Sequence, residues 1–219
     1  MKFAAVLFDC DGVLVDSETI TNRVLRDMLE ERGWSMTLEE CMAFFVGKTV
    51  REERVEIERR TGQPFSEEWM QRFYAQRNAD LAAQLQIVPG AAEAVRAAHA
   101  ECQGRIACAS GADRFKVEMQ LSKVGLMPYF EGRIFSGHEM PRSKPAPDVY
   151  LAAAQHVQTP PAQCLVIEDT VPGVTAGVAA GAEVWALCPQ PHAGAALLQA
   201  GARRLFSHMG QLPLLLSAT

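Results

Sequence analysis

Five short apolar runs alternate with helical patterns along this chain, and this alternation limits the fold more than any other feature. The runs are Phe3–Phe8, Arg105–Ala109, Arg133–Phe135, Cys164–Ile167 and Glu183–Leu187. Helical periodicity separates most of them, over Ala91–Ala100, Lys116–Val124, Asp148–Val157 and Gly173–Ala180. Strands that alternate with helices form βαβ units and a parallel sheet. The sequence therefore predicts an α/β fold, in which ligands bind at the carboxyl ends of the strands.

The segment 17–85 interrupts this alternation. It is rich in charged residues and helical in period, and it contains no convincing strand. Thr37 and Glu40 form a capping box that predicts the start of a helix. We therefore expect a Rossmann-like core made of residues 1–16 and 86–219, with a small helical module inserted between them.

The composition narrows the class of protein. The 219 residues suffice for one sizeable core and a smaller module, and 48% hydrophobic residues is a globular value. A net charge of −5 argues against binding to nucleic acid or membranes. The six cysteines form no C-x-x-C pair, which favours buried, reduced thiols over disulfides or zinc ligands. The N-terminus shows no signal-peptide or membrane-span pattern, so we expect a cytoplasmic protein. We also expect a monomer.

Two acids lie close together in LFDCDGVLVDSE, directly after the first apolar run. Asp9 and Asp11 resemble the start of a calcium-binding loop, but apolar residues occupy the positions where that loop needs an acid and a glycine. Asp16 or Ser17 can cap the helix that follows, which leaves the first two acids unexplained. Acids that repel each other at a strand end indicate a functional site.

A second pair of acids ends another apolar run, in VIEDTVPGVTAG. If the strands are neighbours, Asp169 approaches Asp9, and Glu168 lies beside it. Several carboxylates in one crevice require a cation, and oxygen ligands without a His/Cys cluster predict Mg²⁺. The spaced glycines of this segment indicate a helix that packs closely on the sheet; they are Gly173, Gly177 and Gly181.

Two further positions could bind an anion. Ser110 and Gly111 follow the run RIACA, where a hydroxyl and backbone N–H groups can hold an oxyanion. Lys144 lies in SKPAPD, just before a predicted helix, and could place a positive charge beside a phosphate and Asp9. Taken alone, a Ser-Gly turn is common and an isolated lysine is usually a solvated charge.

The order of motifs DCDGVLVDS, ASG, KPAPD and VIEDTVPGVTAG resembles the haloacid dehalogenase superfamily over the whole chain. The helical insert is similar to the small α-helical cap of that family. Within the family, the chain is similar to the β-phosphoglucomutase-like group of sugar-phosphate phosphatases. The segments IFSGHEMPRSKPAPD and CPQPHAGA particularly resemble members that act on 6-phosphogluconate.

The resemblance implies a Mg²⁺-dependent phosphatase with an aspartyl-phosphate intermediate. By its match, Asp9 is the nucleophile, and Asp11 protonates the leaving oxygen and then activates water. We expected nearby negative charge to raise the pKa of Asp11 so that it can act as an acid. The implied metal ligands are the Asp9 side chain, the Asp11 backbone carbonyl and Asp169, with Glu168 behind them. The implied phosphate-binding residues are Ser110, Gly111 and Lys144.

Asp11 also separates the activities of the family. Dehalogenases and phosphonate-cleaving members lack this second aspartate, so neither activity is expected, and Lys48 is not expected to form a Schiff base. The sugar-phosphate mutases carry a cap histidine where this chain has Thr21. The phosphatase is therefore favoured over two alternatives, a mutase of the β-phosphoglucomutase type and a non-enzymatic binding module on the same fold.

The choice of a small phosphorylated substrate is expected to depend on residues of the cap and the rim of the site. The candidates are Gly47, Lys48, Arg51 and Arg142. Cations at these positions would suit an acidic sugar such as 6-phosphogluconate. The alternative for Arg51 is an ion pair with Glu53 or Glu56 on a solvated helix face.

Overall fold

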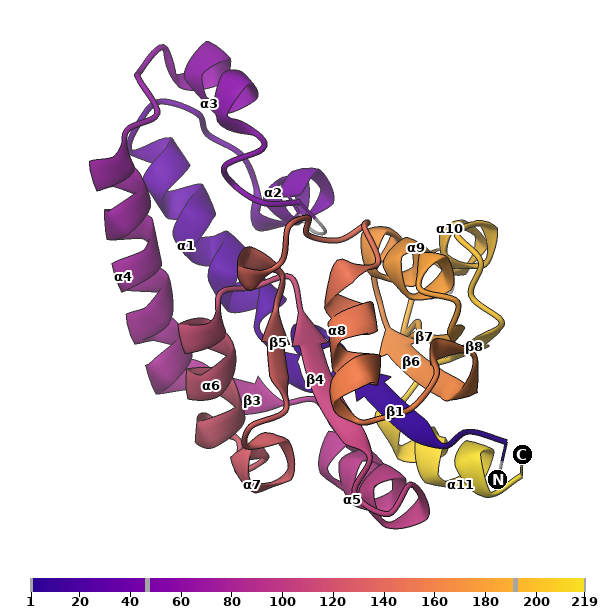
Figure 1. Cartoon of the computed structure of the whole chain (residues 1–219). Coiled ribbons are helices and arrows are strands. Elements are labelled where there is room, and N and C mark those ends of the chain that lie inside the picture. Colours follow the sequence, from indigo (N-terminus) through magenta and orange to yellow (C-terminus); the bar gives the residue numbers. More distant parts are fainter. Residues whose placement is uncertain (1, 46–47, 191–192, 219) are drawn as a thin grey trace. The chain divides into compact units, whose positions relative to one another are not determined.

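A six-stranded parallel sheet forms the core of the larger part of the structure, a computed structural model that describes residues 2–45, 48–190 and 193–218. The strands lie in the order β5-β4-β1-β6-β7-β8 (Figure 1). Their bounds are β1 Ala5–Phe8, β4 Ile106–Ser110, β5 Ile134–Ser136, β6 Cys164–Glu168, β7 Glu183–Leu187 and β8 Arg204–Phe206. The expected α/β fold is therefore confirmed.

Alternate residues of the central strand face opposite sides of the sheet, as strand geometry requires. Leu7 of β1 belongs to a buried cluster with α8, α9 and α10. Phe8, the next residue, instead packs edge-on against Phe130 of α7, with the two ring centroids 6.1 Å apart. Both faces are thus covered, which explains why β1 and β6 read as continuous apolar runs.

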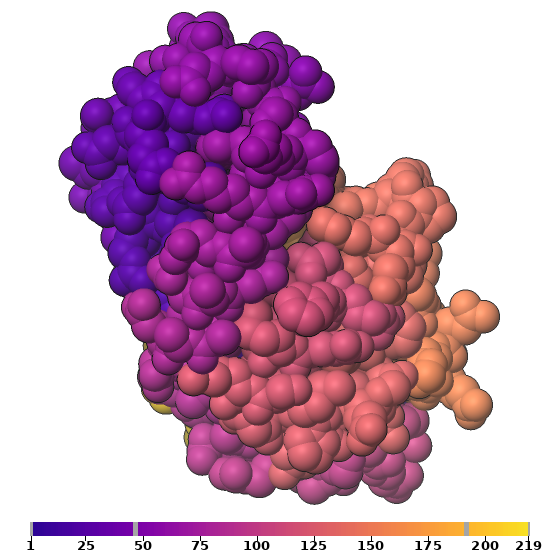
Figure 2. Space-filling view, turned by 90° about the vertical axis from the view of Figure 1, so that its left-hand side faces the viewer, coloured from indigo at the N-terminus to yellow at the C-terminus, as the bar shows by residue number. Residues whose placement is uncertain are grey.

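The helices that flank this sheet come from the chain after residue 90. They are α5 Ala91–Glu101, α6 Arg114–Lys123, α7 Met127–Phe130, α8 Asp148–His156, α9 Val171–Ala179, α10 Gly194–Gln199 and α11 Leu212–Ser217. Among the described residues, short 3₁₀ turns lie at Gly137–Glu139, Pro161–Gln163 and Met209–Gln211. In Figure 2, the pink and salmon atoms are the surface of the segment that includes α6 and α7.

The chain divides into two units by its internal contacts. The first, here the core unit, comprises Met1–Asp16 and Gln86–Thr219, and the second, here the helical unit, comprises Ser17–Leu85. The helices of the second unit are α1 Glu18–Glu30, α2 Leu38–Phe45, α3 Arg54–Thr61 and α4 Glu67–Gln84. Its role as a cap stays a prediction.

Local sequence signals explain the helical unit. The backbone N–H of Glu40 donates to Thr37 Oγ1 at 3.1 Å, and Glu40 Oε2 accepts from the backbone N–H of Thr37 at 2.7 Å, so the predicted capping box is confirmed. Ser66 caps α4 through the backbone N–H of Trp69. A separate apolar core joins these helices, including Leu29, Trp69 and Phe73.

Three strands were not predicted. β8 is short and holds only three residues. β2 (Val15–Asp16) and β3 (Gln86–Ile87) form a two-stranded antiparallel ladder between segments far apart in the sequence. The two strands lie directly before and directly after the helical unit in the sequence. Their pairing therefore joins the two segments of the core unit that the helical unit separates.

Candidate active site

The carboxyl ends of three neighbouring strands carry the predicted site. β1 pairs in parallel with both β4 and β6, and the backbone N–H of Asp9 donates to the Ile167 carbonyl at 3.0 Å. Ser110 is the last residue of β4 and Glu168 the last residue of β6, with Asp169 directly after it. The structure thus brings together residues that are up to 160 positions apart in the sequence, counted from Asp9 to Asp169 (169 − 9).

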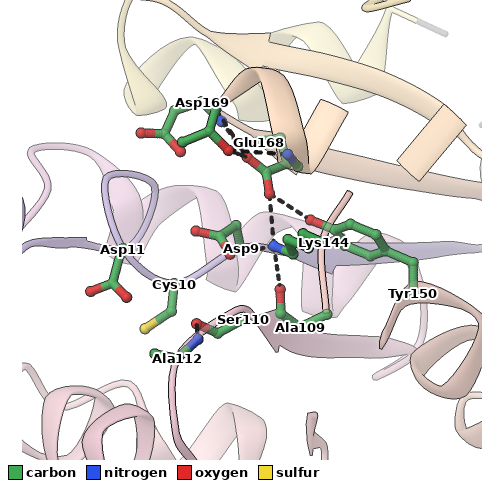
Figure 3. Close-up of polar contacts among 12 residues, drawn as sticks. Asp9, Cys10, Asp11, Ala109, Ser110, Ala112, Lys144, Tyr150, Glu168 and Asp169 are labelled. Atoms are coloured by element: carbon green, nitrogen blue, oxygen red, sulfur yellow. Dashed lines mark hydrogen bonds and ion pairs between the residues drawn. The ribbon is translucent and has the colours of Figure 1, made fainter. Parts of the chain in front are cut away.

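Lys144 is the centre of a buried hydrogen-bond network (Figure 3). Its Nζ donates to Asp9 Oδ1 at 2.6 Å, to Glu168 Oε1 at 2.7 Å and to the Ala109 carbonyl at 2.9 Å. The hydroxyl of Tyr150 donates to the same Glu168 oxygen at 2.9 Å, and its ring centroid lies 4.7 Å from Nζ. Lys144 is therefore a structural partner of Asp9, as the anion-site prediction required, and of Glu168 as well.

Burial and the Lys144 charge oppose each other at the two acids. Burial raises the pKa of Asp9 to about 7, against the lowering effect of Lys144. Burial also raises the pKa of Glu168, but the Lys144 charge and the hydrogen bonds outweigh it, so this pKa lies below its usual value. Burial lowers the pKa of Lys144, yet the two carboxylates hold it well above its ordinary value. Lys144 and Glu168 are thus a charged pair.

The second oxygen of Glu168 organises the turn that follows β6. Glu168 Oε2 accepts from the backbone N–H groups of Asp169 and Thr170, at 2.9 and 3.0 Å, and from the Thr170 hydroxyl. Thr170 in turn caps α9 by accepting from the backbone N–H of Gly173. A Cβ at Gly173 would lie 1.7 Å from Glu168 Oε1, so only glycine allows this helix to approach the acid. Gly177 similarly packs against Val166 and Val184 of the sheet, as predicted.

Three carboxylates could hold a cation. Asp9, Glu168 and Asp169 each offer an oxygen within 4.8 Å of the others. Gly12 makes room for this group, because a Cβ there would lie 2.0 Å from Asp169 Oδ2, and its φ of +79° favours glycine. Donors that are all carboxylate oxygens fit a hard cation such as Mg²⁺. The residues present therefore fit the metal that the family resemblance implies.

Asp11 has a different environment from the one predicted. Its two carboxylate oxygens each accept from Lys116 Nζ at 2.8 Å, and Oδ1 also accepts from Gln120 Nε2 at 2.8 Å. Figure 3 draws its carboxylate apart from the group around Lys144 Nζ. The sequence predicts only negative charge near Asp11, whereas the structure places the Lys116 ammonium beside it.

Ser110 lies where the phosphate-binding prediction places it, at the end of the strand beside β1. Its hydroxyl accepts from the backbone N–H of Ala112 at 3.0 Å, and the side chain is almost fully buried. Gly111 follows, and a Cβ there would reach only Ser143 Oγ, at 3.9 Å. Ser110 thus ends the strand that pairs with β1, and Asp9 directly follows β1.

Comparison with known proteins agrees with this geometry. The model of the haloacid dehalogenase-like hydrolases matches residues 3–181, which include every one of the acids and lysines described above. The chain belongs to the haloacid dehalogenase-like hydrolase family.

Individual relatives of the family are similar over nearly the whole chain. The 6-phosphogluconate phosphatase of Escherichia coli K12 is 29% identical over 97% of this chain and 94% of its own. A crystal structure of a family hydrolase from Deinococcus radiodurans R1, with bound phosphate and sodium, is 33% identical with a TM-score of 0.81, over 99% of this chain and 96% of that one. A Thermotoga maritima structure with a provisional β-phosphoglucomutase assignment is 26% identical, with a TM-score of 0.80 over 98% and 99% of the two chains.

These relatives identify the class of reaction. The chain is an enzyme of the haloacid dehalogenase-like hydrolases, and it is a phosphoric monoester hydrolase. The broader assignment, a family phosphatase that acts on phosphorylated metabolites, agrees with the resemblance of the motifs. None of the described helices is long and apolar enough to cross a membrane.

The three charged candidates for substrate binding each form an ion pair with an acid. Lys48 Nζ lies 3.1 Å from Glu53 and over the ring of Phe44. Arg51 pairs with Glu67 at 2.8 Å, so the alternative pairing with Glu53 or Glu56 is wrong. Arg142 pairs with Asp148 at 3.0 Å. Gly47 lies outside the described residues, and a role of these positions in substrate binding stays a prediction.

Two buried polar residues of the site were not predicted at all. Lys116 and Gln120 lie four positions apart on α6, and both are buried although each is polar. Polar residues with helical spacing on the covered face of a helix were the one signal in the sequence. The expectation for the cysteines is confirmed, since all six are free and buried.

Proposed function

We propose that this enzyme is a Mg²⁺-dependent phosphatase of a small phosphorylated metabolite, and that it reacts through a phosphorylated Asp9. The observation that carries this proposal is the position of the Asp9 carboxylate. It lies 2.6 Å from the buried Lys144 ammonium, within reach of the same cation as Asp169, and two residues before Asp11. We thus assign four groups to one region of the core unit: a nucleophile, a positive charge that binds phosphate, carboxylates that bind a cation, and a second acid.

In the proposed first step, a carboxylate oxygen of Asp9 attacks phosphorus. The new O–P bond forms as the bond from phosphorus to the sugar oxygen breaks, and Asp11 gives its proton to that leaving oxygen. Lys144 and Ser110 bind the phosphoryl oxygens in this role. When bound, Mg²⁺ neutralises charge on Asp9 and on the phosphoryl group, which lets two anions approach each other.

In the proposed second step, water replaces Asp9 on phosphorus. Asp11, now ionised, takes a proton from the water as its oxygen bonds to phosphorus and the Asp9 O–P bond breaks. The products are inorganic phosphate and the original carboxylate. Asp11 therefore gives one proton and takes one proton in each turnover, so the side chain returns to its starting state.

We infer an acidic sugar phosphate, such as 6-phosphogluconate, as the substrate. The similarity to the Escherichia coli phosphatase supports this choice. The cations Lys48, Arg51 and Arg142 also support it if they leave their carboxylate partners, because ion pairs of exposed cations contribute little free energy. A mutase of the β-phosphoglucomutase type is the second candidate, favoured by the Thermotoga maritima neighbour and opposed by Thr21 in place of the cap histidine.

The test is a phosphate-release assay on a panel of sugar phosphates. The panel includes 6-phosphogluconate, fructose 1-phosphate and β-glucose 1-phosphate, each with Mg²⁺ and with a chelator, and the last also with a trace of glucose 1,6-bisphosphate. Chelator-sensitive phosphate release, abolished in Asp9→Asn, is the expected result. Conversion of glucose 1-phosphate to glucose 6-phosphate without phosphate release would support the mutase. Binding without any turnover would support a binding module.

A further inference from the structure

Each aspartate of the DCD motif has its own buried lysine. Lys144 contacts Asp9 from the loop before α8, and Lys116 contacts Asp11 from the first turn of α6. The Lys116 ammonium lies 2.8 Å from both oxygens of the Asp11 carboxylate, and the residue is 6% exposed. The proposed chemistry uses the first lysine to bind phosphate but gives the second no role.

Lys116 is held in place by the start of its own helix. Asp113 caps α6, and its Oδ1 accepts from the backbone N–H of Lys116 at 2.9 Å. Gln120 follows one helical turn later on the same face and donates to Asp11 Oδ1 at 2.8 Å. Two donors from one rigid element thus fix one carboxylate.

The orientation of Gln120 is also fixed from its other end. Its Oε1 accepts from the thiol of Cys10 at 3.5 Å, so its NH₂ group faces Asp11. Cys10 and Gln120 are both fully buried. Successive residues of the loop after β1, Cys10 and Asp11, are therefore both bonded to the same amide of α6.

Stability alone does not account for this cluster. A buried ion pair is often no more stabilising than apolar side chains of the same volume, because both charges lose their hydration. The Lys116 ammonium donates to both oxygens of Asp11, so its charge is directed at that carboxylate. What the arrangement does supply is a single, well-defined position for the Asp11 side chain.

We propose that Lys116 and Gln120 are positioning residues for proton transfer by Asp11. This inference rests on the proposed function, in which Asp11 protonates the leaving oxygen of the substrate. A misplaced Asp11 would slow the cleavage of substrates whose leaving group needs a proton, and it would leave substrates with a good leaving group almost unaffected.

The experiment follows the first turnover and the later turnovers of two substrates, each in excess over the enzyme, with Mg²⁺. One is the best sugar phosphate of the panel, whose leaving group is an alkoxide, and the other is p-nitrophenyl phosphate, whose leaving group is stable without a proton. The variants are Lys116→Met and Gln120→Leu. The control is Lys123→Met, which removes an exposed lysine from the same helix.

We expect Lys116→Met to slow the first turnover of the sugar phosphate by about 10- to 100-fold, a part of the usual contribution of a general acid. The rate of the first nitrophenolate release should change by less than about threefold, because this leaving group needs no proton. Later nitrophenolate release should slow, because Asp11 must also activate water. Gln120→Leu should show the same pattern with a smaller effect, and Lys123→Met should behave as wild type.

An equal loss on both substrates would overturn the inference, since it would show a general structural role. The double variant Asp11→Asn/Lys116→Met removes both charges together and guards against misfolding of the single variant. If Lys116 acts through Asp11, the double variant should be no slower on the sugar phosphate than Asp11→Asn alone. A further loss in the double variant would also contradict the inference.

Failure of the proposed function would look different. In that case Asp11→Asn itself would show no preference between the two leaving groups, whatever the Lys116 variant does. If Asp11→Asn is selective and Lys116→Met is not, only the inference about positioning is wrong.

Discussion

The ion pairs around Lys144 in the core unit and the ion pair of Arg51 in the helical unit each join a cation to a carboxylate, but they differ in burial. Lys144 and its partners Asp9 and Glu168 are each less than 10% exposed at the side chain. Arg51 and Glu67 of the helical unit are 48% and 60% exposed. Breaking a buried pair leaves a charge without water or a partner, whereas an exposed pair is readily replaced by solvent. The comparison teaches that the buried charges around Lys144 are fixed in place by the fold, whereas an exposed cation such as Arg51 can exchange its partner.

The largest predicted effect is the loss of Glu168. Glu168→Ala removes a partner of Lys144 and the acceptor that holds the backbone at Asp169 and Thr170. We expect a loss of about 3–5 kcal/mol in the free energy of unfolding, because a buried charge network is broken. Urea denaturation measures this, with Glu67→Ala in the helical unit as the matched control, which should lose less than about 1 kcal/mol. Equal losses in the two variants would contradict the comparison.

The next effect concerns glycines of the two units. Gly173→Ala places a Cβ against the Glu168 carboxylate, and we expect a loss of about 1–3 kcal/mol from overpacking. Gly62→Ala in the helical unit meets no atom within 4 Å but has a φ of +63°, so only backbone strain of about 1 kcal/mol is expected. Unfolding midpoints of the two variants test this. Only Gly173→Ala should also lower activity, so a similar loss of activity in Gly62→Ala would be evidence against the account.

Asp169→Asn is expected to weaken cation binding while the fold remains intact. Removing one of three clustered carboxylates should raise the Mg²⁺ concentration for half-maximal activity by at least about tenfold. Titration of activity with Mg²⁺ measures the change, and calorimetry measures binding without turnover. Asp80→Asn, at an ion pair of the helical unit, is the control and should not alter the Mg²⁺ requirement. An unchanged requirement in Asp169→Asn would remove this residue from the proposed metal site.

The smallest effect on stability is expected at the candidate substrate residues. Lys48→Met and Arg51→Met break exposed pairs and should change the free energy of unfolding by less than about 0.5 kcal/mol. If these cations bind an acidic sugar, KM for 6-phosphogluconate should rise while kcat stays within about twofold. KM for a neutral sugar phosphate should remain the same. A similar rise in KM for both substrates would show that the residues do not select the acid.

Local and periodic features of the fold were predictable from the sequence. The capping box at Thr37 and Glu40 depends on four neighbouring residues, and the apolar runs of β1 and β6 mark strands buried on both faces. β8 is too short to produce a period, and the ladder of β2 and β3 joins segments that are separated by the whole helical unit. Such pairing is set by tertiary contacts and leaves no local signal.

The sequence also predicted those site residues that lie at strand ends or in motifs, but not their distant partners. Asp9, Asp169, Ser110 and Lys144 follow strand ends or lie in motifs that the family resemblance covers, and the structure gathers them in the core unit. Lys116 lies 105 positions from Asp11, and an isolated lysine on a helix is usually a solvated charge. Its pairing therefore became visible only when α6 was placed beside the loop after β1. In the same way, no pattern indicated that Arg51 pairs with Glu67.

The most direct test of the account is to trap the phosphorylated enzyme. The Asp11→Asn variant, in which hydrolysis of the intermediate should be slow, is mixed with Mg²⁺ and p-nitrophenyl phosphate, whose leaving group needs no proton from Asp11, then quenched with acid and reduced with borohydride. Reduction converts an aspartyl phosphate to homoserine, which mass spectrometry locates in the chain. We predict homoserine at position 9, and none when the variant also carries Asp9→Asn. Release of one equivalent of leaving group without homoserine at position 9 would contradict the central claim.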